Sequence, residues 1–127
     1  MHTATDDSVT LVEILEVLGS FDETRQLVRA CVARLEREGV PGLASMIFYE
    51  DAAAKELAAV ITFSSSTEIL AHTQMISGWP EFQRFGTLIR VKDMRIHGRV
   101  SAEVRAWLDQ FQGPRRLFEL HLAGFSR

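Results

Sequence analysis

The segment 65–85 carries the side chains best suited to chemistry. It reads SSTEILAHTQMISGWPEFQRF and places a histidine, a tryptophan and two phenylalanines in one short stretch. His72 is the first catalytic candidate, because an imidazole with a pKa near neutrality can accept a phenolic or enolic proton, or hydrogen-bond a substrate carbonyl. The alternative is a histidine that packs in the core and bonds to a backbone carbonyl.

Aromatic side chains near His72 are candidates for the walls of a flat apolar pocket. The candidates for substrate binding are Trp79, Phe82, Tyr49, Phe63 and Phe85. Tyr49 is the only tyrosine, and its hydroxyl could donate a hydrogen bond from the end of a strand. For the other aromatic residues, packing in an ordinary hydrophobic core is the alternative.

Two acidic residues interrupt the apolar segment 9–18. Glu13 and Glu16 point to opposite faces if this segment is a strand, because side chains alternate along a strand. A carboxyl group that points inward would have a raised pKa and could act as a base. Pairing with an arginine across a dimer interface is the alternative.

Composition and spacing disfavour several classes of function. The net charge is -3 with the two signs interspersed, so no basic face is expected to bind nucleic acid. Cys31 is the only cysteine and lies on an apolar stripe, which predicts a buried thiol without a disulfide. The four histidines have no metal-binding spacing, so we expect no metal, and the eight scattered glycines form no phosphate-binding loop for a nucleotide cofactor.

The sequence also bears on cellular location. The first seven residues, MHTATDD, lack the basic start and apolar core of a signal peptide. No apolar run approaches the roughly 20 residues that a membrane-spanning helix needs. We therefore expect a cytoplasmic protein that does not bind membranes.

Hydrophobic periodicity predicts an α+β chain with the order β-α-β-β-α-β, the ferredoxin-like arrangement. A capping box, Ser20 to Glu23, predicts the start of the first helix, and Gly39 with Pro41 predicts its end. A second capping box, Ser65 to Glu68, predicts the start of the second helix, which breaks at 77–80 and begins again. The predicted strands are 9–18, 43–50, 56–64 and 89–97, and the charged pair Lys92 and Asp93 predicts an edge or a bulge in the last of them.

Two elements follow this core. Ser101 is predicted to cap a helix with Val104, Trp107, Leu108 and Phe111 on its apolar side, and 117–122 is predicted to be a fifth strand. We interpret 1–127 as a single domain, with a ferredoxin-like core at 8–98 and an extension at 99–127.

Several short motifs resemble the antibiotic biosynthesis monooxygenase family. They are Val12-Glu13-Ile14 in the first strand, 48–51 (FYED) at the end of the second, 68–72 (EILAH), and Ser77 ahead of 80–82 (PEF). The resemblance covers about residues 8 to 98. It implies a ferredoxin-like fold whose sheets pair into a dimeric α+β barrel, with a pocket in each protomer for a flat aromatic or quinone-like molecule.

The resemblance also implies a function. Characterised members oxygenate such molecules without metal or flavin, and the family histidine falls on His72 and the later aromatic on Phe82. The haem-degrading branch is disfavoured, because its first-strand asparagine has no counterpart in 9–18. We therefore expect a homodimeric, cofactor-independent monooxygenase-like protein. The alternatives are a non-catalytic ligand-binding or dimeric module, and an isomerase or lyase on the same barrel.

Overall fold

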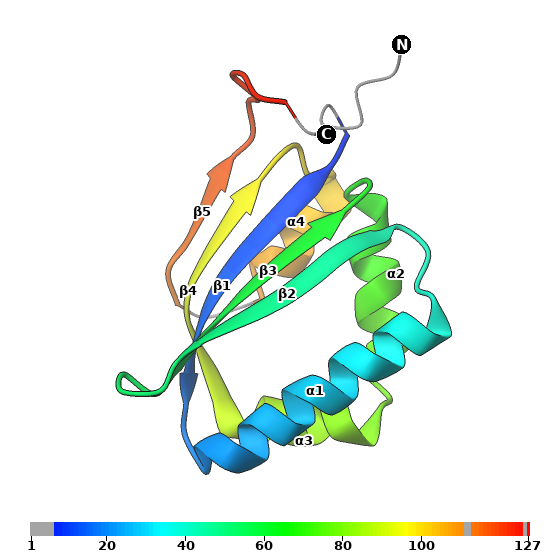
Figure 1. Cartoon of the computed structure of the whole chain (residues 1–127). Coiled ribbons are helices and arrows are strands. Elements are labelled where there is room, and N and C mark those ends of the chain that lie inside the picture. The colour runs from blue at the N-terminus through cyan, green and yellow to red at the C-terminus, as the bar shows by residue number, and fades with distance from the viewer. Residues whose placement is uncertain (1–6, 111–112, 126) are drawn as a thin grey trace.

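The computed structural model describes residues 7–110, 113–125 and 127. Within them, five strands form one mixed sheet in the order β2-β3-β1-β4-β5, and helices cover one of its faces (Figure 1). The predicted ferredoxin-like α+β fold is confirmed. The elements are β1 (Val9–Val17), α1 (Phe21–Glu38), β2 (Leu43–Asp51), β3 (Glu56–Phe63), α2 (Thr67–Ile76), α3 (Pro80–Leu88), β4 (Ile89–His97), α4 (Ala102–Leu108) and β5 (Arg115–Phe118).

The central strand β1 positions the interior of the molecule. It pairs antiparallel with β3 on one side and β4 on the other. Val9, Leu11, Leu15 and Val17 are buried, as expected for alternate residues that face the helices. The pairing with β4 shifts between Ile14 and Leu15, which confirms the irregularity predicted near Lys92.

The helix boundaries follow local capping chemistry. Ser20 accepts a hydrogen bond from the backbone N–H of Glu23 at 3.1 Å, and Gly39 ends α1 with a left-handed φ of 67°. The predicted capping box at Ser65 is wrong. Ser66 is the N-cap of α2, and its Oγ instead accepts a hydrogen bond from the N–H of Ser101 at 3.0 Å. This bond ties the start of α2 to the start of α4.

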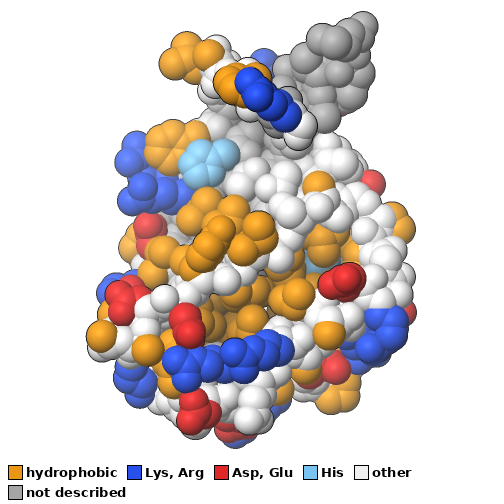
Figure 2. Space-filling model, viewed as in Figure 1, with side chains coloured by type: hydrophobic (Ala, Val, Ile, Leu, Met, Phe, Trp, Pro, Cys, Tyr) orange, Lys and Arg blue, Asp and Glu red, His pale blue; other side chains and the backbone are white. Residues whose placement is uncertain are grey.

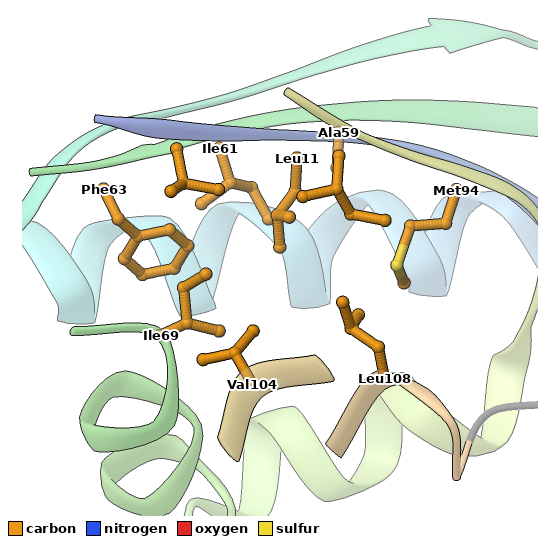
Figure 3. Close-up of a cluster of buried hydrophobic side chains, with 10 residues drawn as sticks. Leu11, Ala59, Ile61, Phe63, Ile69, Met94, Val104 and Leu108 are labelled. Atoms are coloured by element: carbon orange, nitrogen blue, oxygen red, sulfur yellow. The ribbon is translucent and has the colours of Figure 1, made fainter. Parts of the chain in front are cut away.

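The main hydrophobic core lies between the sheet and helices α2 and α4. Figure 3 shows Leu11, Ile61 and Met94 pointing from three strands toward Val104 and Leu108 of α4. Val104 and Leu108 are 0% and 1% exposed, so the short α4 helix contributes two fully buried side chains. The C-terminal extension is thus packed into the same core as the strands.

The last strand differs from the prediction. β5 begins at Arg115, ends at Phe118 and pairs parallel with β4 of its own chain, whereas a strand over 117–122 was predicted. Leu120 and Leu122 follow it and are 80% and 98% exposed. Phe111, expected on the apolar side of α4, lies outside the described residues.

None of the helices in the described part of the chain covers the second face of the sheet. In Figure 1, α2 and α4 lie behind the strands, and Figure 2 shows hydrophobic side chains gathered over the strands on the viewer's side. Strand pairing places two apolar rows on this open face: Ile47-Val60-Val12 and Tyr49-Ala58-Ile14. Ion pairs border the rows, including Arg90 with Glu16 and Lys92 with Glu56 at 2.5 Å.

Candidate functional site

A cavity of about 350 Å³ lies between the sheet and helices α2, α3 and α4. This volume is in the usual range for small-molecule sites. Its lining comes from every strand except β5 and is apolar apart from three side chains, Glu13, His72 and Thr73. The other lining residues are Leu11, Leu15, Met46, Phe48, Ile61, Phe63, Ile69, Ile76, Phe82, Phe85, Gly86, Ile89, Val91 and Trp107.

His72 lines this cavity from the middle of α2. Its side chain is only 5% exposed, and its ring meets that of Phe63 edge-on, with ring centroids 5.3 Å apart. Its Nδ1 atom is buried and has no hydrogen-bond partner among the described residues. Burial lowers the pKa of His72 below its ordinary value, so the ring is neutral at pH 7. The alternative, a core histidine that bonds to a backbone carbonyl, therefore does not apply to Nδ1.

Glu13 faces the same cavity from β1. The carboxyl group lies on the helix-covered side of the sheet, half-buried because part of its side chain lines the cavity. Desolvation by burial raises the pKa of Glu13 to about 7. Glu16 faces the other way and forms an ion pair with Arg90 of its own chain. The two carboxylates of β1 therefore take different roles, and only Glu13 meets the condition set for a base.

The aromatic candidates separate into two groups. Phe63, Phe82 and Phe85 line the cavity together with His72. Trp79 lies outside its lining, beside a smaller cavity of about 40 Å³, with the guanidinium of Arg34 4.1 Å from the ring centroid. Tyr49 is 59% exposed and lies on the open face of the sheet.

Trp107 is a cavity residue that the sequence did not single out for the site. It lies on α4, which the resemblance does not cover, and it lines the cavity opposite the strands. Its only sequence signal is its place on the apolar side of the helix that begins after Ser101. The extension after residue 99 therefore contributes a side chain to the cavity lining.

Other reactive groups lie apart from the cavity. Cys31 is buried as predicted, and burial raises the pKa of its thiol to about 11. In the described part of the chain, no three His, Cys, Asp or Glu side chains are close enough to hold a metal ion. Among the same residues, no helix is both long and apolar enough to cross a membrane.

Solved structures share this architecture. MupZ from Pseudomonas fluorescens matches with a TM-score of 0.68 and 16% identity, over 95% of each chain. SnoaB, a cofactor-independent oxygenase from Streptomyces nogalater, matches with a TM-score of 0.60 and 15% identity, over 76% of this chain and 96% of its own. A putative antibiotic biosynthesis monooxygenase from Chloroflexus aurantiacus matches with a TM-score of 0.57 and 13% identity, over 75% of this chain and 95% of its own.

These matches differ in how far they extend. SnoaB and the Chloroflexus protein match about three quarters of this chain, whereas MupZ matches nearly all of it. No protein-family model and no curated protein sequence matches the chain. At these identities the structures establish the fold alone. The chain therefore has the fold of the antibiotic biosynthesis monooxygenases, as its sequence resemblance predicts.

Proposed function

We propose that the protein binds a small, flat aromatic or quinone-like molecule in the cavity beside His72 and oxidises it with molecular oxygen, without metal or flavin. The observation that carries this proposal is the cavity itself: about 350 Å³, lined mainly by apolar and aromatic side chains, with a buried imidazole at its wall. The fold shared with SnoaB, a cofactor-independent oxygenase, is consistent with it.

His72 is the residue proposed to contact the substrate's oxygen. Oxygenation without a cofactor needs the substrate anion, because the anion gives an electron to oxygen more readily than the neutral molecule does. A neutral imidazole can hydrogen-bond the oxygen on which that negative charge gathers. The buried Nδ1 of His72 has no hydrogen-bond partner among the described residues, which supports a role in bonding the substrate.

Oxygen uptake with anthrone tests the proposal. We expect the wild-type protein to speed oxygen consumption, and His72→Ala to reduce the rate by about 10²-fold, the usual contribution of one such polar group. His121→Ala is the matched control, because His121 is exposed and lies outside the cavity lining. Binding of anthrone without oxygen uptake would favour the alternative, a non-catalytic ligand-binding module.

We also propose a homodimer in which the open face of the sheet meets the same face of a second copy. The two apolar rows on this face would otherwise remain in water. Sedimentation velocity at micromolar concentration is expected to show a dimer, and a stable monomer would contradict it. The cytoplasmic location and the lack of nucleic-acid binding stay predictions.

A further inference from the structure

We propose that Glu13 is the proton-accepting catalytic residue of the cavity, and that its substrate is an uncharged, flat molecule with a weakly acidic C–H or O–H group. This inference rests on the proposed function to the extent that the cavity must bind such a molecule. It assigns the proton transfer to Glu13, and it leaves His72 as the hydrogen-bond partner of the substrate's oxygen.

The position of Glu13 in the sheet surrounds its carboxyl group with hydrocarbon. Across the strands it is aligned with Ala59 of β3 and Met94 of β4, which are 0% and 3% exposed. Along its own strand, Leu11 and Leu15 precede and follow it on the same face and are buried. Figure 3 shows Leu11, Ala59 and Met94 on the helix-covered side of the sheet. An acidic residue costs free energy in such a place, so its presence there calls for a function.

No described residue of the cavity lining is a cation that could offset this carboxylate. Among its described lining residues, the only titratable groups are Glu13 on β1 and His72 on α2. The other elements present apolar or uncharged side chains, such as Phe48 of β2, Ile61 of β3, Phe85 of α3, Val91 of β4 and Trp107 of α4. An anionic substrate would thus be repelled by the carboxylate of Glu13. A cationic substrate would lose its hydration shell on entering the cavity and would gain only one ion pair, with Glu13, in return. An uncharged molecule fits this surface best.

Burial shifts the pKa values of the two titratable groups in opposite directions, as a proton transfer to Glu13 requires. Burial raises the pKa of Glu13 to about 7. Near neutral pH a large fraction of the molecules therefore carries the ionised carboxylate, and its basicity is high enough for it to accept a proton. Burial lowers the pKa of His72, so the ring stays neutral and does not neutralise the carboxylate. In the proposed step the proton moves to a Glu13 carboxylate oxygen, and the electron pair stays on the substrate as an enolate or phenolate. That anion is the species that the proposed oxidation needs.

A probe that requires only a base separates this step from the oxidation. In 5-nitrobenzisoxazole, a base removes the proton from C3, the C–H electron pair completes the C≡N bond, and the N–O bond breaks to leave a phenolate. The reaction consumes no oxygen, and the coloured phenolate reports its rate. The probe is flat, uncharged and apolar, which are the properties inferred for the substrate.

We expect the wild-type protein to open the probe's ring with a kcat that rises as pH increases through about 7, the pKa of Glu13. Glu13→Gln is expected to lower kcat by about 10²-fold or more and to remove this pH dependence, while the probe still binds. Glu13→Asp should restore part of the rate. Glu16→Gln is the matched control, because Glu16 lies on the opposite face, and its rate should equal that of the wild type.

The outcomes are distinguishable. Binding of the probe without turnover, or a rate that survives in Glu13→Gln, would overturn the proton-accepting role while the proposed binding site remains. Loss of the rate in His72→Gln together with a wild-type rate in Glu13→Gln would assign the base to His72 and would also overturn it. Failure of the probe to bind at all would overturn the inferred substrate class and the proposed function together.

Discussion

Glu13→Gln is expected to stabilise the protein by about 3 kcal/mol at pH 8.5 and by less than about 1 kcal/mol at pH 5. The pKa of Glu13 is raised from 4.5 to about 7 in the folded state, because burial penalises the charged carboxylate. The unfolded chain therefore loses this proton at lower pH than the folded chain does. The free energy of unfolding of the wild-type protein therefore decreases as the pH rises from about 4.5 through about 7. The Glu13→Gln variant lacks this decrease, because glutamine does not titrate.

Urea denaturation of the wild-type protein and the variant at the two pH values gives the difference directly. Glu16→Gln serves as the control, because Glu16 lies on the same strand but faces the opposite side, paired with Arg90. Its effect should be small at both pH values, as is usual for surface ion pairs. Equal stability of Glu13→Gln and the wild type at pH 8.5 would show that the carboxylate is solvated, contrary to the structure.

Leu108→Ala is expected to destabilise the protein by about 3 kcal/mol, within the usual range for truncating a buried leucine. Leu108 is 1% exposed and packs in the main core with Leu11, Ile61 and Met94 of three strands (Figure 3). A decrease of this size in the free energy of unfolding would show that the C-terminal extension is part of the same hydrophobic core as the ferredoxin-like elements.

Leu122→Ala is the matched control, since it makes the same substitution in the extension at a side chain that is 98% exposed. Its effect on the free energy of unfolding should lie within about 0.5 kcal/mol. Thermal or urea denaturation compares the two variants. Similar values for both would contradict the packing of α4 described above. A large effect of Leu122→Ala alone would instead point to burial of the tail, for example against a second copy.

The sequence predicted the elements of the core closely, because their signals are local. The capping box at Ser20, the C-terminal Gly39 and the break before Pro80 each act within a few residues. The fourth strand, Ile89–His97, was predicted with its observed bounds, and the irregularity near Lys92 was predicted from charges in an apolar strand. These features do not depend on which distant segment lies nearby.

The errors arise where distant contacts decide the outcome. Ser66 rather than Ser65 is the N-cap of α2, and its Oγ accepts a hydrogen bond from the N–H of Ser101, which lies 35 residues away in sequence. β5 ends at Phe118, where Gly98 N–H donates to the Phe118 carbonyl at 2.9 Å, and the apolar residues after it remain outside the sheet. Local hydrophobicity over 117–122 cannot reveal where pairing with β4 stops.

The candidate site shows the same division. Alternation along 9–18 separates Glu13 from Glu16, but both faces of that strand carry apolar residues. The sequence could not choose which face the helices cover, so it left the role of Glu13 open. Four of the candidates line the cavity: His72, Phe63, Phe82 and Phe85. Trp79 lies outside this lining and packs against the guanidinium of Arg34. Tyr49 falls on the open face because of its register with Ala58.

The most direct measurement is an NMR titration of protein labelled at its isoleucine δ1 methyl groups with anthrone. Ile61, Ile69, Ile76 and Ile89 line the cavity, whereas Ile14 and Ile47 lie on the open face and Ile96 is buried in the core. We expect saturable shifts of the four cavity methyl signals, with the open-face signals unchanged. Shifts confined to Ile14 and Ile47, or no shifts at all, would show that the space beside Glu13 and His72 is not a binding site for a flat apolar molecule.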